Sequence, residues 1–233
     1  MTPVDLTARL VALPLFAGIP PAQIEEICHE ARLVPLAKGT AMFGQEEEAH
    51  SFFLLLEGRL RVTRVTPAGQ QVVVRFINPG EICGVAMAMG RTTYPATAEI
   101  VVDGTALAWP TAIWPRLVER FPALPINMLR AVGGRLQETQ TRVVEMSTAQ
   151  VEQRVAHALL RLARQSGRKV AAGIEIDFPI SRQDVAEMTG TTLHTVSRIL
   201  SAWEERRLVE GGRMRIVIRD LEGLRRMAER EPE

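Results

Sequence analysis

The chain has 233 residues, 46% of them apolar, and a formal net charge of only +1. This length accommodates one or two domains with hydrophobic cores, and the near-neutral charge excludes nucleic-acid binding through overall basicity. Two cysteines, Cys28 and Cys83, form neither a disulfide framework nor a metal-ligand cluster, and no apolar run is long enough to cross a bilayer. We therefore expect a soluble cytoplasmic protein in which any footprint for DNA is local.

The first part of the chain predicts short helices and then many short strands. Residues 4–31 carry apolar side chains at helical spacing, and over residues 33–110 the apolar period changes to two. Turn signals such as Glu57-Gly58 and Asp103-Gly104 recur at intervals of about ten residues, which is typical of an antiparallel barrel or roll. The expected strands are Arg32–Leu36, Thr40–Phe43, Ser51–Glu57, Arg59–Thr66, Gln71–Ile77, Glu81–Val85, Thr97–Val101 and Thr105–Trp109.

A long helix is predicted over Pro125–Thr148, after a shorter one over Thr111–Phe121. Its apolar residues interleave at spacings of three and four through about three heptads, which indicates one side of a two-stranded coiled coil. A helix lying on the roll would need a similar stripe, but the length and the charged outer faces favour a dimer helix. The seam residues are Leu129, Val132, Leu136, Thr139, Val143 and Met146, of which Thr139 is the one polar residue.

The last third of the chain predicts a helix-turn-helix. A hinge near Ser147–Gln150, a helix over residues 149–166, a polar loop and a strand over residues 174–178 lead to Ser181. Ser181 and Asp184 predict a capping box, Gly190 suits a helix end, and Thr191 or Thr192 can cap the second helix. We expect that helix to bury Leu193, Val196, Ile199, Leu200 and Trp203 and to expose His194, Thr195, Ser197, Arg198 and Ser201.

A β-hairpin is expected after the second helix, with Gly211-Gly212 as its turn. Arg213 and Arg215 would then share one strand face, where both could meet DNA phosphates. The hairpin makes the unit a winged helix-turn-helix, whose second helix can read the major groove. An ordinary helical hairpin in a globular core is the alternative.

A β-roll, a long dimer helix and a winged helix-turn-helix, in this order, resemble the CRP/FNR family of bacterial transcription regulators over nearly the whole chain. The subgroup it looks most similar to regulates nitrogen-oxide respiration and related anaerobic functions. The stretches that carry the resemblance are FFLLLEGRLRV (Phe52–Val62), NPGEICG (Asn78–Gly84), YPATAE (Tyr94–Glu99) and RQDVAEMTGTTLHTVSRIL (Arg182–Leu200).

The resemblance implies an α+β protein with three parts. Residues 1–121 would form a cyclic-nucleotide-binding-like jelly roll with flanking helices, residues 122–148 the dimerisation helix and hinge, and residues 149–233 the winged helix-turn-helix. It also implies a homodimer on a palindromic site in double-stranded DNA, with RNA polymerase as a further partner, and a small effector or cofactor sensed by the roll.

The resemblance places a candidate effector pocket at Gly80, Glu81, Tyr94 and Ala96. In the family that the chain resembles, members that bind cyclic nucleotide have Gly-Glu in one turn of the roll and Arg-Ser-Ala after it. The arginine of the second motif holds the cyclic phosphate. This chain keeps Gly80-Glu81 but has Tyr94-Pro95-Ala96 at the second place, and a tyrosine supplies neither the charge nor the fork of a guanidinium. We therefore do not expect cyclic AMP to bind as it does in those members.

Other cofactors of the family fit this sequence unequally. Two cysteines cannot provide the four thiolates of the iron–sulfur cluster held by oxygen-sensing members. Haem, through which some members sense nitric oxide or carbon monoxide, stays open because His29, His50 and His157 are available, although each also fits a surface or packing role. The cofactor is thus left unknown, and a closed roll that needs no ligand is a further alternative.

The resemblance also implies how DNA is read. Ser197 and Arg198 match the serine and the arginine, respectively, of the family's recognition helix, where the arginine reads guanine, so a TTG-like half-site is expected. The family's glutamate is His194 here, which leaves the neighbouring base open. The other side chains expected at DNA, chiefly at phosphates, are Arg182, Thr192, Thr195, Arg213 and Arg215.

Two rival functions belong to other classes. An enzyme is not expected, because the sequence has no glycine-rich phosphate loop, nucleophile elbow or metal-spaced His/Glu set. A dimeric scaffold whose winged helix binds protein remains the second alternative.

Overall fold

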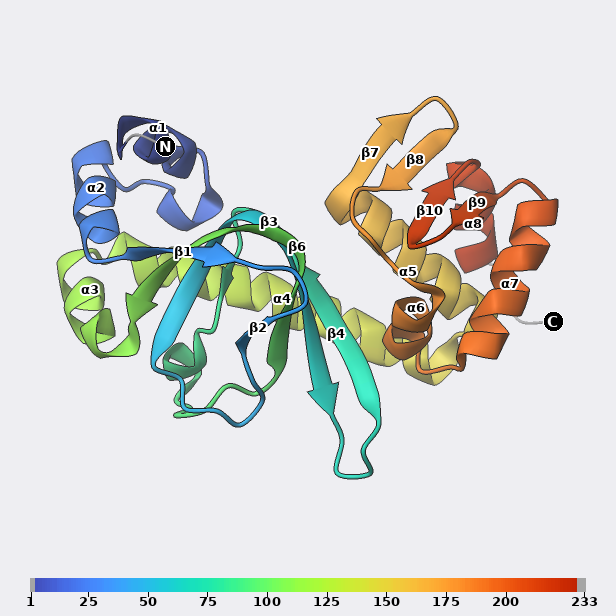
Figure 1. The fold of residues 1–233 in the computed structure, drawn as a ribbon, viewed down its shortest axis with the longest axis horizontal. Coiled ribbons are helices and arrows are strands. Elements are labelled where there is room, and N and C mark those ends of the chain that lie inside the picture. Colours follow the sequence, from blue (N-terminus) through green and yellow to red (C-terminus); the bar gives the residue numbers. More distant parts are fainter. Residues whose placement is uncertain (1–2, 230–233) are drawn as a thin grey trace. The chain divides into compact units, whose positions relative to one another are not determined.

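The computed structural model describes residues 3–229 (Figure 1). The chain divides into two compact units, one comprising Met1–Arg64 and Phe76–Thr139 and the other Val65–Arg75 and Gln140–Glu233.

The first unit contains most of the antiparallel roll that the period-two pattern predicts, while Val65–Arg75, with the greater part of one strand, groups with the second unit. Its sheet has the strand order β1-β6-β3-β4, with β2 paired to β6 and β5 paired to β3, and every pairing given is antiparallel. The strands are β1 (Arg32–Leu36), β2 (Ala41–Phe43), β3 (Ser51–Val65), β4 (Gln71–Ile77), β5 (Ile82–Cys83) and β6 (Thr97–Pro110).

Two expected turns in the roll are wrong. Glu57-Gly58 lies inside β3 and Asp103-Gly104 inside β6, and the register between these strands shifts around Glu57. The two glycines sit where the strands cross: a Cβ on Gly104 would lie well inside 3.0 Å of the Glu57 carbonyl, and one on Gly58 would lie 2.6 Å from the Val102 oxygen. The glycines therefore mark an irregular, bulged crossing and do not reverse the chain.

Two apolar clusters use the two faces of this sheet. One fills the inside of the roll and includes Phe43, Phe53, Leu60 and Tyr94. The other lies between the sheet and the surrounding helices, which gather at one end of the roll in Figure 1. These helices are α1 (Pro3–Val11), η1 (Pro14–Phe16), α2 (Pro21–His29), α3 (Trp114–Arg120) and the start of α4 (Ala123–Thr148); the short helices η2 (Ala86–Met89) and η3 (Thr111–Ile113) complete the unit.

Helix α4 is buried only in its first turns, and farther along it Arg135 donates to the Ile82 carbonyl of the roll. Leu124, Asn127 and Met128 are buried, and the Asn127 side-chain amide donates to the carbonyls of Leu15 (3.0 Å) and Ala17 (2.8 Å). No residue of α4 after Met128 is classed as buried.

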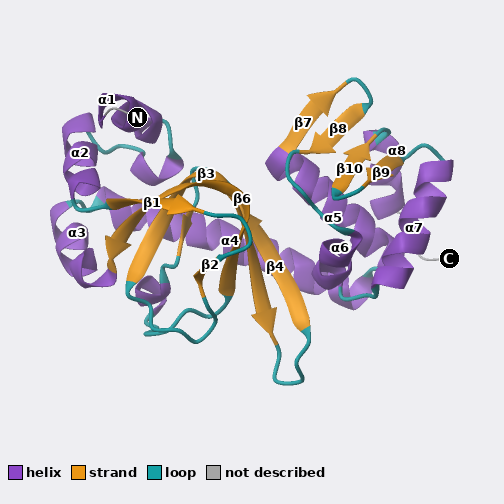
Figure 2. Cartoon of the chain, viewed as in Figure 1, coloured by secondary structure: helices purple, strands orange, loops and turns teal. Residues whose placement is uncertain are grey.

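The second unit packs helices beside a small four-stranded sheet with the order β7-β8-β10-β9 (Figure 2). Strand β7 lies in a segment that the sequence predicts to be a polar loop, and that prediction is wrong. Arg168 and Lys169 are exposed on this edge strand, so the segment lacks the apolar alternation that would indicate a strand. The elements are α5 (Val151–Ser166), β7 (Gly167–Val170), β8 (Gly173–Ile176), α6 (Arg182–Thr189), α7 (Leu193–Glu205), β9 (Val209–Gly212), β10 (Arg215–Ile218) and α8 (Leu221–Ala228).

The β3–β6 crossing can be tested with glycine substitutions. Gly104→Ala forces a methyl group against the Glu57 backbone, so we expect the free energy of unfolding to fall by about 2 kcal/mol, as for other overpacked sites. Gly134→Ala is the control, because a Cβ there meets nothing within 4 Å and the helix should gain up to about 1 kcal/mol. Urea denaturation followed by tryptophan fluorescence measures both, and wild-type stability of Gly104→Ala would contradict the close crossing.

Candidate nucleic-acid interface

Helix α6 begins and ends as its sequence predicts. The Ser181 hydroxyl accepts from the Asp184 backbone N–H (3.0 Å), while the Asp184 carboxylate accepts from the Ser181 N–H (2.8 Å) and hydroxyl (2.6 Å). The predicted capping box is thus confirmed, and it explains why a carboxylate only 2% exposed is tolerated. Gly190 ends the helix with a φ of 61°, and Thr192, not Thr191, caps α7 by accepting from the Thr195 N–H.

One face of α7 is anchored in the core of the second unit. Val196, Leu200 and Trp203 are at most 2% exposed, and the Trp203 indole N–H donates to the Glu152 carboxylate on α5 (2.7 Å). The expectation for Leu193 is wrong, since this side chain is 48% exposed. As the first residue of α7, Leu193 extends the apolar stripe beyond the part of the helix that the core covers.

The opposite face of α7 is polar and accessible. His194, Arg198 and Ser201 are exposed, and Thr195 and Ser197 are half-buried. Within the described residues, no hydrogen bond or ion pair is recorded for the side chains of His194, Ser197 and Arg198. The helix thus presents donors and one cation that have no partner in the described part of the chain.

The wing differs from its predicted geometry. Gly211 and Gly212 belong to β9, and because Gly212 pairs with Arg215, the turn consists of Arg213 and Met214, the latter with a φ of 57°. Arg213 is therefore exposed at the tip of the wing and does not share a strand face with Arg215. Adjacent glycines predict a turn, but the pairing of Gly212 with Arg215 places the turn at Arg213 and Met214 instead.

Arg215 is held by two carboxylates from neighbouring strands. Its guanidinium donates to Glu175 on β8 (3.0 Å) and to Glu210 on β9 (2.9 Å). These hydrogen bonds, with Glu210 the larger contributor, raise the pKa of Arg215 above its ordinary value. Arg215 thus cross-links the wing.

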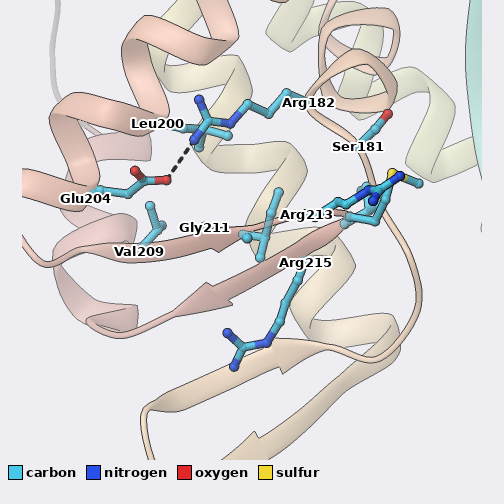
Figure 3. A pocket seen from close by; sticks show the side chains of 12 residues that line it. Ser181, Arg182, Leu200, Glu204, Val209, Gly211, Arg213 and Arg215 are labelled. Carbon is cyan, nitrogen blue, oxygen red and sulfur yellow. Dashed lines mark hydrogen bonds and ion pairs between the residues drawn. The ribbon is translucent and has the colours of Figure 1, made fainter.

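Arg182 is also paired within the second unit. Its Nη2 donates to Glu204 Oε1 (2.9 Å) at the edge of a hollow of about 280 Å³ between α6, the end of α7 and the wing. Figure 3 shows Arg182 and Glu204 pointing toward each other, with Arg215 extending away from that pair. Among the four arginines expected at DNA, the described contacts leave Arg198 and Arg213 unpaired and engage Arg182 and Arg215.

The four residues expected to form an effector pocket lie in two different surroundings. Gly80 packs beside Leu13, and the Glu81 carboxylate accepts from the Asn78 N–H (3.2 Å) and side-chain amide (2.8 Å), which closes their turn. Tyr94 and Ala96 are buried with the inside of the roll.

Tyr94 fills part of that interior. Its ring stacks on Phe43 with the centroids 4.1 Å apart, and its hydroxyl donates to the Ser51 carbonyl (2.6 Å). Burial raises the pKa of Tyr94. The inside of the roll is thus occupied by the chain's own apolar and aromatic side chains.

The candidate haem ligands lie elsewhere. His29 and His50 are exposed, His157 lies 3.9 Å from Glu145, and none of the three belongs to the interior cluster of the roll. Burial, reinforced by Glu25, raises the pKa of Cys28 to about 11, and the buried Cys83 lies against the Met42 sulfur (4.0 Å). Over residues 3–229, no group of three or more His, Cys, Asp or Glu side chains is arranged to hold a metal ion.

The seam of α4 is open to solvent. Leu129 is 71% exposed, Leu136 58%, Val143 60% and Met146 46%, with Thr139 exposed and Val132 half-buried.

Within the described residues, no helix is both long and apolar enough to cross a membrane.

Two family models match separate parts of the chain. A "Cyclic nucleotide-binding domain" model matches residues 33–121, and a "Crp-like helix-turn-helix domain" model matches residues 153–227. These ranges cover the roll and the winged unit described above.

Curated relatives match most of the chain. The "Cyclic AMP receptor protein" of Thermus thermophilus is 29% identical over 89% of this chain and 93% of the relative. The "Nitrogen fixation regulation protein FixK" of Bradyrhizobium diazoefficiens is 28% identical over 78% of this chain and 76% of its own length. "Transcriptional activator protein FnrA" of Stutzerimonas stutzeri is 28% identical over 82% of this chain and 78% of the relative.

Solved structures share the fold. FixK2 from Bradyrhizobium japonicum has a TM-score of 0.75 at 21% identity, covering 87% of this chain and 99% of that one. The Thermus thermophilus catabolite activator protein has a TM-score of 0.53 at 27% identity, covering 92% of this chain and 98% of that one. With both domain models, the relatives and the fold in agreement, the chain belongs to the CRP/FNR family of DNA-binding transcription regulators.

Proposed function

We propose that this regulator binds a palindromic site with TTG and CAA half-sites as a homodimer, presenting one α7 helix to each half-site. The observation that carries the proposal is the accessible face of α7, where Arg198 and His194 have no partner within the described chain while the opposite face is anchored. Residues 149–233 would bind DNA, residues 122–148 would pair the protomers, and residues 1–121 would form the sensor-like roll.

The side chains on this face have separate roles in the proposal. Arg198 donates two hydrogen bonds to guanine O6 and N7, the most common specific contact in the major groove. Leu193 is exposed at the start of the helix, where an apolar side chain suits the methyl group of a thymine. His194 contacts the neighbouring base, and Ser197 lies between these positions.

Phosphate contacts position the helix in the groove. Thr192 and Thr195 lie at the N-terminus of α7, where backbone N–H groups also favour phosphate. Arg213 reaches a phosphate from the wing tip, and Arg182 does so from the start of α6. Arg215 acts indirectly, because its bonds to Glu175 and Glu210 fix the wing.

The unpartnered seam of α4 supports a dimer. Exposed Leu129, Leu136 and Val143 repeat every seven residues, and a second copy of the helix would remove all three from water. A dimer also matches the two-fold symmetry of a palindromic site.

We further propose that the roll is closed and that the regulator does not need cyclic AMP. The Thermus relative is named a cyclic AMP receptor protein, but this chain has Tyr94 where the family resemblance expects a phosphate-holding arginine, and the tyrosine ring packs against Phe43. This packing favours a ligand-independent roll over a small effector or a haem-bound gas, since none of the candidate histidines belongs to the interior cluster. The protein would act in the bacterial cytoplasm with RNA polymerase as its partner and without enzyme activity.

The recognition helix is tested by Arg198→Ala. We expect affinity for the preferred site, selected from random DNA, to fall by about 1–3 kcal/mol, while weak salt-dependent binding to any DNA remains. Arg226→Ala removes the same charge from α8 and serves as the control. Fluorescence anisotropy measures both, and unchanged preference in Arg198→Ala would disprove the role of this face.

The dimer seam is tested by Leu136→Lys. A buried ammonium in the seam should shift the protein toward monomer, whereas Gln137→Lys, one residue outside the seam, should remain a dimer. Light scattering coupled to gel filtration gives the mass of each variant. An intact Leu136→Lys dimer would contradict the heptad interpretation.

The closed roll is tested by calorimetric titration with cyclic AMP. We expect no heat at micromolar nucleotide, because burial and stacking leave Tyr94 unable to hold a phosphate. An absorption spectrum with added haem should likewise show no Soret band of a bound complex. A clear cyclic AMP isotherm or such a band would refute the closed roll.

A further inference from the structure

The glycine pair in the wing has no turn to form, so its presence needs another cause. Gly211 and Gly212 are both in β9, and neither has the positive φ that would require glycine. Their surroundings differ sharply. A Cβ on Gly211 would lie well inside 3.0 Å of Glu204 Oε1 and 3.4 Å from Arg182 Nη2, whereas one on Gly212 would meet nothing nearer than the Arg215 Cβ at 3.5 Å.

Because Gly211 has no side chain, it leaves room for the Arg182–Glu204 ion pair. Arg182 is the first residue of α6, Glu204 lies in the last turn of α7, and the 2.9 Å contact between them lies beside Gly211 of β9 (Figure 3). Three elements of the winged helix thus meet at one guanidinium. The two side chains are 35% and 34% exposed, so the pair remains accessible from the rim of the hollow.

We propose that Glu204 is a positioning residue that orients Arg182 for a DNA phosphate, and that Gly211 is glycine so that this pair can lie flat on the wing. The inference rests on the proposed function. A guanidinium has five N–H donors, and the contact with Glu204 Oε1 uses one, which leaves the rest of the fork for a phosphate. Because a free arginine loses much rotamer freedom when it is fixed, pairing before DNA arrives lowers the cost of the contact.

The opposite arrangement is also physically conceivable: Glu204 would withhold Arg182 from DNA by competing with the phosphate. The two arrangements predict opposite signs. If Glu204 positions Arg182, breaking the pair weakens binding and removes about one phosphate contact from the salt dependence. If Glu204 withholds Arg182, breaking the pair strengthens binding and adds one.

Gly211→Ala breaks the pair without changing any charge, and Gly212→Ala is its matched control one residue away. Full-length protein is titrated with its selected DNA site over a series of salt concentrations. We expect Gly211→Ala to bind about three- to tenfold more weakly, with a log–log salt slope shallower by about one and the same preferred sequence. Gly212→Ala should match the wild type in affinity, slope and preference.

Two further comparisons separate positioning from a general structural defect. In an Arg182→Ala background, Gly211→Ala should cause no further loss of affinity, because the side chain to be oriented is absent. Glu204→Gln keeps an oxygen acceptor for Arg182 and should keep the wild-type salt slope, whereas Glu204→Ala should lose about one unit of slope. These glutamate variants decide the question should Gly211→Ala fail to fold.

Each outcome has one meaning. Equal affinity and slope for Gly211→Ala and Gly212→Ala would overturn the inference, as would tighter binding by Gly211→Ala. A further loss from Gly211→Ala in the Arg182→Ala background would also overturn it. Failure of the wild-type protein to select any DNA sequence would instead reject the proposed function.

Discussion

The attachment of α7 to the core of its unit is the constraint on which the exposed polar face of this helix depends. Val196, Leu200 and the fully buried Trp203 anchor one face, and the Trp203 indole satisfies its donor on Glu152. Since a helix has only one orientation that buries this stripe, Arg198 and His194 are necessarily presented on the other side. The Thr192 cap fixes the residue at which α7 begins. It therefore also fixes the positions of His194 and Arg198 along the helix.

Around this helix, the arginines differ in whether a carboxylate pairs with them. The second unit carries many arginines, but carboxylates engage Arg161, Arg168, Arg182, Arg215 and Arg219. Arg198 and Arg213 remain without recorded partners in the described chain. A protein with a net charge of +1 therefore presents local positive charge on the exposed face of α7 and at the tip of the wing.

The roll combines the fold of the matched family domain with an interior filled by the chain's own side chains. The strands and the family model describe a cyclic-nucleotide-binding domain, yet Tyr94 and Phe43 stack in its interior and the Tyr94 hydroxyl is satisfied by Ser51. Glu81 is likewise used to close its own turn. A shared fold does not by itself imply a shared ligand.

The sequence by itself determined the local features: the Ser181–Asp184 capping box, a threonine cap at Thr191 or Thr192, the helix end at Gly190 and the segments that form strands, except β7. Each depends on neighbours within a few residues, so pattern and propensity suffice. Only the tertiary structure decided that Gly58 and Gly104 mark a strand crossing, that Gly211 seats an ion pair, that Leu193 is exposed, and that Arg182 and Arg215 are engaged. A glycine in a sequence signals that backbone or side chains can come close but not what comes close, and the burial or pairing of a side chain depends on residues far away in the chain.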